Sequence, residues 1–390
     1  MANTDILTSF FLIFAGAAVV ATAALYTRQP MLVAYIILGA LLGPFGVGLL
    51  NDTALLANIA ETGIIFLLFL VGLDLPTQKL KNMLGESLLT ALGTTMMFFS
   101  AGAGVMLGFG YSLTEAAVVG IGVTFSSTIL GIKLLPTTVL HHRHVGEIVI
   151  SLLLVQDLLA IIAILLIGYL GSGPSNSHQE LLMLVFGLPA LIAAALVFVR
   201  LAILPLLAKF DAFHEYIFLL AIGWCLTIAF ASHSLGLSFE IGGFIAGVSL
   251  ATSPIAQYIA NHLKPLRDFF LVLFFFTVGA SINLGMLSSL WMPIIVLACV
   301  ILLVKPWTFQ RLLAAQGETP DSAKEVGLRL GQASEFSLLV SYMALGAGLL
   351  STAGATILQT ATVITLLVNS YWVVSRYPSP IAADPALRRD

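Results

Sequence analysis

The sequence has few charged residues: Asp, Glu, Lys and Arg make up 9% of its 390 residues, against about 25% in soluble globular proteins. Such a chain cannot cover a water-facing surface, and 59% of its residues are hydrophobic. Apolar runs of about 20 residues, the length that crosses a bilayer, recur from end to end. Soluble enzymes, nucleic-acid-binding proteins and disordered scaffolds are therefore excluded. We expect an all-α polytopic membrane protein.

Other absences narrow the class further. The two cysteines, Cys225 and Cys299, both lie inside apolar runs, so neither a disulfide framework nor a metal cluster is expected. The net charge of −3 indicates no polyanionic partner such as nucleic acid. The sequence also has no phosphate-binding glycine loop, no nucleophile–base pair and no redox motif. We therefore expect neither an enzymatic activity nor a resident cofactor.

Breaking the sequence at polar residues and at glycine and proline clusters predicts thirteen membrane spans. They are 6–26, 31–50, 54–73, 87–109, 114–134, 146–170, 180–205, 214–232, 237–252, 267–283, 288–310, 325–347 and 351–375. When the connections are read alternately, all Lys and Arg residues fall on one side or lead from it into a span. The positive-inside rule then puts the N-terminus outside and the C-terminus in the cytoplasm. Residues 377–390 are expected to be a disordered cytoplasmic tail.

Polar residues in the middle of two spans are candidate site residues, because polar groups are costly in hydrocarbon. In the sixth span, Gln156 and Asp157 lie about 16 Å from the start of the helix, near mid-bilayer. Asp157 is expected to take up and release protons. The fifth span has four hydroxyl residues at the same depth: Thr124, Ser126, Ser127 and Thr128. They indicate an unwound segment whose oxygens bind a dehydrated cation, although such hydroxyls can also simply bond to their own helix.

The twelfth span is interrupted in the same way, by Arg329, Gln332, Ser334 and Glu335. Broken backbone is tolerated in a membrane only where it lines a cavity or is buried in protein. If spans 1–6 and 8–13 are repeats joined by the seventh span, they have opposite orientations, and spans 5 and 12 hold equivalent places. The sequence therefore predicts inverted six-helix repeats with two broken crossing helices and a site where these helices meet.

Two further features have competing interpretations. Lys305, in the eleventh span, either snorkels to the surface beside Trp307 or is a buried ammonium that compensates Asp157, with Pro306 bending the helix. The run His141–His144 resembles a metal-binding tract, but it has no partnering cysteine. We interpret it as a solvated cytoplasmic loop with some pH sensitivity.

Five motifs occur in order along the chain: Ser126–Thr128, Gln156–Asp157, Gly242–Gly247, Phe274–Gly279 and Gly331–Phe336. As a set they resemble the membrane part of Kef-type potassium efflux antiporters, in the second monovalent cation:proton antiporter family. The resemblance covers about residues 5–375. It implies a sodium/proton-antiporter-like fold and a homodimer in the lipids of a bacterial inner (plasma) membrane.

The resemblance also implies a division of one transport domain, residues 1–376. A mobile core would comprise about 87–170 and 288–375, and a dimerisation scaffold about 6–73 and 180–283. By similarity, Asp157 carries the cation and the proton in turn. Gln156, Thr124, Ser126, Ser127 and Thr128 would complete the binding site. The supporting residues would be Lys305, Arg329, Gln332, Ser334 and Glu335.

The implied function is exchange of a monovalent cation for H⁺ by an elevator-type mechanism. Sodium-transporting relatives often have two adjacent acids where this chain has Gln156 and Asp157, which favours K⁺ and electroneutral exchange. The alternatives are a Na⁺/H⁺ antiporter of the same fold, a channel-like K⁺ pathway not coupled to protons, and a non-transporting membrane sensor. Kef proteins usually continue into a nucleotide-binding domain. None follows Arg376 here, so we expect a missing domain, a separate cytoplasmic regulatory subunit, or a member that works without this control. We do not carry over glutathione control.

Overall fold

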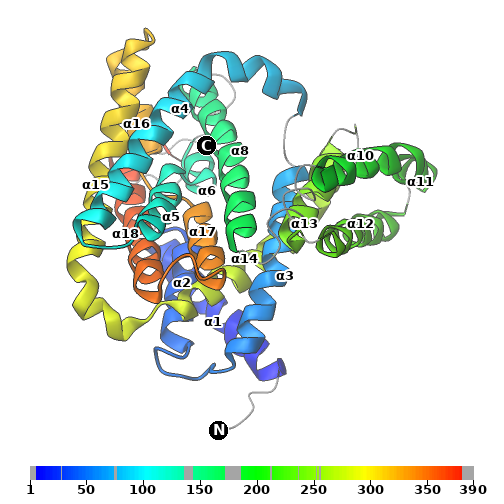
Figure 1. The fold of residues 1–390 in the computed structure, drawn as a ribbon, viewed down its shortest axis with the longest axis horizontal. Helices are drawn as coiled ribbons and strands as arrows, with labels where there is room; N and C mark the ends of the chain where they lie inside the picture. Colours follow the sequence, from blue (N-terminus) through cyan, green and yellow to red (C-terminus); the bar gives the residue numbers. More distant parts are fainter. Residues whose placement is uncertain are drawn as a thin grey trace. The chain divides into compact units, whose positions relative to one another are not determined.

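The computed structural model describes residues 6–27, 29–73, 77–135, 144–171, 186–210, 213–235, 237–251, 253 and 256–379, which are almost entirely helical. The first helices are α1 (Ile6–Tyr26), α2 (Met31–Leu42), α3 (Thr53–Leu73), α4 (Thr77–Gly108), α5 (Leu113–Thr124), α6 (Thr128–Lys133) and α8 (His144–Gly171). They are followed by α10 (Leu188–Phe198), the π-helical η3 (Val199–Ile203), α11 (Leu204–Lys209), α12 (His214–Ser234), α13 (Phe239–Ala251) and α14 (Ala256–Ser281). The last are η4 (Leu284–Met286), α15 (Leu287–Ala315), α16 (Pro320–Arg329), α17 (Glu335–Gly346) and α18 (Thr352–Arg376) (Figure 1).

The helices have the lengths and composition of membrane spans. Within the described residues, seven are long and apolar enough to cross a membrane, and five more are apolar but shorter. This confirms the all-helical, polytopic class, whereas the number of thirteen crossings stays a prediction. The predicted span 180–205 begins outside the described residues, and its described part is formed by α10, η3 and α11.

Some helix ends differ from the predicted spans. α4 begins at Thr77 and α14 at Ala256, each about ten residues earlier than predicted. Hydropathy marks where the apolar stretch begins, but backbone hydrogen bonding continues through polar sequence at the membrane surface. α2 ends at Leu42, where the sequence predicts a span up to residue 50. The chain turns after Leu42, and Gly48 has a φ of +71°, a conformation that favours glycine.

The helices group into two compact units. Unit 1 contains residues 1–52, 82–171 and 278–390, and unit 2 contains 53–81 and 172–277. Every predicted site residue belongs to unit 1, as do α1 and α2, which we predicted to be part of the scaffold. In unit 2, α13 packs closely on α3, because a Cβ atom added at Gly247 would lie 2.0 Å from the carbonyl oxygen of Phe69. This gives the Gly242–Gly247 motif a packing role.

Two helices of unit 1 are interrupted where the sequence predicts. α5 ends at Thr124 and α6 begins at Thr128. α16 ends at Arg329 and α17 begins at Glu335. We call residues 125–127 the first break and residues 330–334 the second break. The two interrupted helices are thus confirmed, and the inverted repeat stays a prediction.

Candidate cation site

Asp157 lies on α8 beside the first break, with its side chain buried and the residue 9% exposed. Thr128, the first residue of α6, donates its hydroxyl to this carboxylate and lies 3.0 Å from both oxygens. A carboxylate has about four acceptor positions, so one hydroxyl leaves capacity for a cation or a proton. Glu335, at the start of α17, interacts electrostatically with Asp157. The start of α17 therefore brings a second acidic side chain near the same site.

Gln156 connects α8 to both breaks. Its Oε1 accepts a hydrogen bond from the backbone N–H of Ser126 at 3.0 Å. The Ser126 hydroxyl in turn donates to the carbonyl oxygen of Leu330 at 2.8 Å. Both side chains are fully buried. Two consecutive hydrogen bonds thus run from α8 through the first break to the second.

Lys305 on α15 also joins the two breaks. Its Nζ donates to the carbonyl oxygens of Val123 (3.2 Å), Phe125 (2.7 Å) and Gln332 (2.9 Å). The residue is 1% exposed, and Nζ lies 5.0 Å from the centre of the Phe98 ring. The end of a helix presents unpaired carbonyls and a partial negative charge, which an ammonium compensates.

The geometry rules out one of the two interpretations of Lys305. The snorkelling interpretation is wrong, because the side chain is buried. Among the described residues its hydrogen bonds go to carbonyls of the two breaks and of Val123 at the end of α5, and none goes to Asp157. That the buried ammonium compensates Asp157 stays a prediction.

The other hydroxyls of the fifth span do not contact Asp157 in the structure. Thr124 donates to the carbonyl of Ile121 in its own helix at 2.7 Å. Ser127 Oγ accepts from the N–H of Leu130 at 3.1 Å and so caps the start of α6. Of the four predicted ligands, Thr128 reaches the carboxylate, Ser126 links the breaks, and the other two stabilise helix ends.

The second break is held largely by its own sequence and by α18. In a capping box at the start of α17, Ser337 Oγ accepts from the N–H of Ser334, and Ser334 Oγ accepts from the N–H of Phe336. The N–H of Ala333 donates to Thr365 Oγ1 at 3.1 Å. The side-chain amides of Gln332 and Asn369 are hydrogen-bonded to each other. The sequence analysis missed Thr365 and Asn369, whose signal is their spacing of four residues, which places both polar side chains on one face of α18.

Arg329, at the end of α16, fastens α6 to the chain after α18. Its guanidinium donates to the carbonyls of Leu134 (2.9 Å) and Pro378 (3.0 Å) and pairs with Glu325. Pro378 lies in the predicted disordered tail, so ordered contacts extend further than expected. Residues 380–390 of that tail lie outside the described residues.

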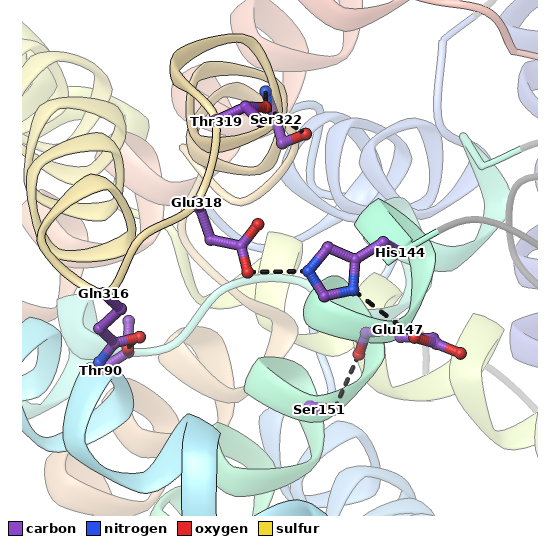
Figure 2. Close-up of polar contacts among 8 residues, drawn as sticks. All are labelled: Thr90, His144, Glu147, Ser151, Gln316, Glu318, Thr319 and Ser322. Atoms are coloured by element: carbon purple, nitrogen blue, oxygen red, sulfur yellow. Dashed lines mark hydrogen bonds and ion pairs between the residues drawn. The ribbon is translucent and has the colours of Figure 1, made fainter.

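A polar cluster links the start of α8 to the loop between α15 and α16 (Figure 2). A ring nitrogen of His144 lies 2.8 Å from Glu318 Oε1, and the other lies 3.7 Å from Glu147. The hydrogen bond to Glu318 is the main cause of a raised pKa for His144. Thr90 on α4 donates to Gln316 in the same loop at 2.7 Å. His141, His142 and Arg143 lie outside the described residues, so the interpretation of the whole histidine run stays a prediction.

A buried carboxylate beside two interrupted helices is typical of helical membrane transporters that bind ions at broken helices. The fold agrees, because the chain superposes on the solved structure of the sodium proton antiporter MjNhaP1 from Methanocaldococcus jannaschii at pH 8 with a TM-score of 0.71. The match covers 94% of this chain and 96% of that one, at 15% sequence identity. The family described as "Sodium/hydrogen exchanger, transmembrane" matches residues 10–375, and the chain belongs to this family.

Individual relatives agree with the resemblance found in the motifs. K(+) efflux antiporter 6 of Arabidopsis thaliana is 30% identical over 327 residues, which cover 80% of this chain and 53% of that protein. The chain thus spans about half the length of this relative. Iron transporter MagA of Paramagnetospirillum magneticum is 28% identical over 359 residues, covering 89% of this chain and 80% of that protein. These relatives are transporters, not enzymes.

Proposed function

We propose that the chain exchanges a monovalent cation, K⁺ by preference, for H⁺, and that both ions compete for Asp157. The observation that carries this proposal is the buried Asp157 carboxylate, hydrogen-bonded to Thr128 where a membrane helix is interrupted. The hydroxyl and the carboxylate supply oxygen ligands for a partly dehydrated cation. The proton binds the same carboxylate when the cation leaves.

Competition at one carboxylate couples the two fluxes. An empty, ionised Asp157 is costly in the middle of a bilayer, so the site crosses only when it is loaded with a proton or a cation. The like charge of Glu335 adds to this cost, because two neighbouring carboxylates resist being ionised together. The leak of either ion alone is therefore low.

The preference for K⁺ and for electroneutral exchange is supported by Gln156. The position beside Asp157 holds an amide, and that amide is already used to accept the N–H of Ser126. One cation can therefore replace one proton on one acid. The names of three relatives, K(+) efflux antiporters, also support K⁺ as the transported cation. The neighbour in fold is a sodium proton antiporter, so Na⁺ is the rival to be tested.

We further propose an elevator movement, in which a core of about 87–170 and 288–375 moves against a scaffold of about 6–73 and 180–283 in a homodimer. The contacts between Asp157, the two breaks, Lys305 and α18 all lie within the core ranges. The distribution of Lys and Arg supports an inner-membrane protein with its C-terminus in the cytoplasm. A regulatory domain or subunit would act from that side. The mechanism requires no resident cofactor.

The test is proton flux in proteoliposomes on addition of K⁺ or Na⁺ across a pH gradient. The wild type should release protons on K⁺ addition, and Asp157→Asn should abolish the exchange while leaving the fold and the dimer intact. Glu147→Gln, which changes an exposed carboxylate on the same helix, is the matched control and should stay active. A response to Na⁺ alone would move the protein to the sodium branch. K⁺ flux without proton movement would indicate a channel-like pathway, and exchange retained in Asp157→Asn would contradict the assignment of the site.

A further inference from the structure

α18 carries a stripe of buried polar side chains, of which only Thr365 and Asn369 contact the second break. They are Thr356, Gln359, Thr362, Thr365 and Asn369, each at most 1% exposed. Their spacing of three or four residues makes each one a neighbour of the next along the helix, in a row that winds about half way round α18 from Thr356 to Thr365. From Thr356 to Asn369 the stripe is roughly 20 Å long, about two thirds of the thickness of a bilayer core.

Several of these side chains have no protein partner for a polar atom. Among the described residues this holds for Thr356 Oγ1, Gln359 Nε2, Thr362 Oγ1 and Asn369 Oδ1, and for Gln332 Nε2 in the second break. A threonine in a membrane helix usually donates to a carbonyl one turn earlier. Thr365 and Thr308 do so, with oxygen–oxygen distances of 2.8 and 2.7 Å. Thr365 apart, the stripe is therefore not explained by ordinary bonding within the helix.

Unpaired polar atoms are expensive in hydrocarbon, and buried water is the usual partner where protein offers none. We propose that the stripe on α18 binds a file of water molecules that extends along the helix to the second break. Each water would bridge neighbouring polar atoms, one turn apart on the helix. The inference is independent of which cation the protein carries.

Contacts near the two ends of the stripe support this assignment. Near its start, Ser281 at the end of α14 lies 3.5 Å from Gln359 Oε1, and just beyond its last residue Ser370 donates to Gln29 at 3.2 Å. At its last residue, Asn369 Oδ1 points at the second break, because a Cβ atom added at Gly331 would lie 3.1 Å from it. Water at this point would solvate the amide pair of Gln332 and Asn369 beside backbone that is not helical.

The change in Tm of threonine variants tests the proposal, because a hydrated stripe and a dry stripe predict changes in opposite directions. Thr356→Val and Thr362→Val keep the shape of the side chain and remove one hydroxyl. If each hydroxyl binds water, each variant should lower the Tm of the purified protein in nanodiscs by about 1–3 °C. If the stripe is dry, removing an unpaired buried hydroxyl should instead raise the Tm. A rise in both variants would overturn the proposal.

Thr308→Val on α15 is the matched control, because its hydroxyl is buried and already bonded to Val304. Its fall in Tm should be no larger than that of the two stripe variants. A density map at a resolution that orders buried water gives the direct readout. Water within hydrogen-bond distance of Thr362 Oγ1 and Asn369 Oδ1 is expected, whereas side chains paired with one another and no density between them would refute the file.

Discussion

Both breaks leave backbone N–H and carbonyl groups without partners in their own helix, and the two breaks pair these groups in different ways. The first break depends on side chains from other helices: Gln156 accepts the N–H of Ser126, and Lys305 binds the carbonyl of Phe125. The second break is longer and also binds side chains of other helices, Thr365 at Ala333 and Lys305 at Gln332, but it ends in a capping box made by Ser334 and Ser337. Backbone groups in a membrane must be satisfied in either case. The difference is that the residue beside Asp157 bonds directly to the backbone of the first break, whereas the second break ends in a local cap.

This difference assigns distinct roles to the breaks. The residue next to Asp157 holds the first break in place, so a change at the carboxylate is felt directly by that backbone. The hydrogen bonds of the capping box at the start of α17 do not involve Asp157. We therefore expect the first break to respond to ion occupancy and the second to act as the stable reference. The predictions below test this asymmetry.

The largest effect is expected for Lys305→Met, because one ammonium serves both breaks. The change leaves three buried carbonyls without their donor and should cost about 3 kcal/mol of stability or more, together with loss of exchange. Thermal unfolding and proteoliposome flux measure the two effects. Arg311→Met, an exposed position on the same helix, is the control. Wild-type stability and flux in Lys305→Met would show that the breaks do not need this link.

Thr128→Val should weaken cation binding at the first break. The variant removes the hydrogen bond to the charged carboxylate, worth about 1.5–3 kcal/mol, and leaves the side-chain shape unchanged. The proton-bound form then gains over the cation-bound form, so the KM for K⁺ should rise about tenfold or more. Thr128→Ser should restore the wild-type KM. An unchanged KM in the valine variant would remove Thr128 from the binding site.

Gln156→Leu and Ser337→Ala compare the breaks directly. The first leaves the buried N–H of Ser126 without an acceptor, at a cost of about 1–3 kcal/mol. The second removes one member of a local cap, at a cost of about 1 kcal/mol. Gln156→Leu should also slow exchange, and Ser337→Ala should leave it close to wild type. Both variants are measured by denaturation and by proteoliposome flux. If they lose the same stability and the same flux, the two breaks do not have the distinct roles proposed here.

The smallest effect concerns the surface pair of His144 and Glu318. The pair raises the pKa of His144 above its ordinary value of 6.5, so its stabilisation is fully present below pH 6.5 and is lost as the pH rises through the raised pKa. His144→Gln should therefore lower the Tm at pH 5.5 by more than at pH 9. Both shifts are small, because exposed ion pairs contribute little. An equal shift at the two pH values would rule out a charged pair.

Much of this architecture could be predicted from sequence, for a physical reason. Polar residues such as Ser126 and Glu335 stand out in apolar runs, so their position along the chain located the two breaks. The partners of Lys305 could not be predicted, because they are carbonyl groups, which every residue has. Thr365 and Asn369 were missed for a similar reason: one hydroxyl or amide in a membrane helix is common, and only the tertiary packing shows which ones meet a break.

The contacts of Arg329 connect the end of the described chain to the ion site. Its guanidinium donates hydrogen bonds to the backbone carbonyl of Pro378 and to that of Leu134, just after α6. The other end of α6 begins at Thr128, the residue that holds Asp157. A pull on the backbone near Pro378 would therefore be passed through α6, which is six residues or about 9 Å long, to the residue that binds the Asp157 carboxylate.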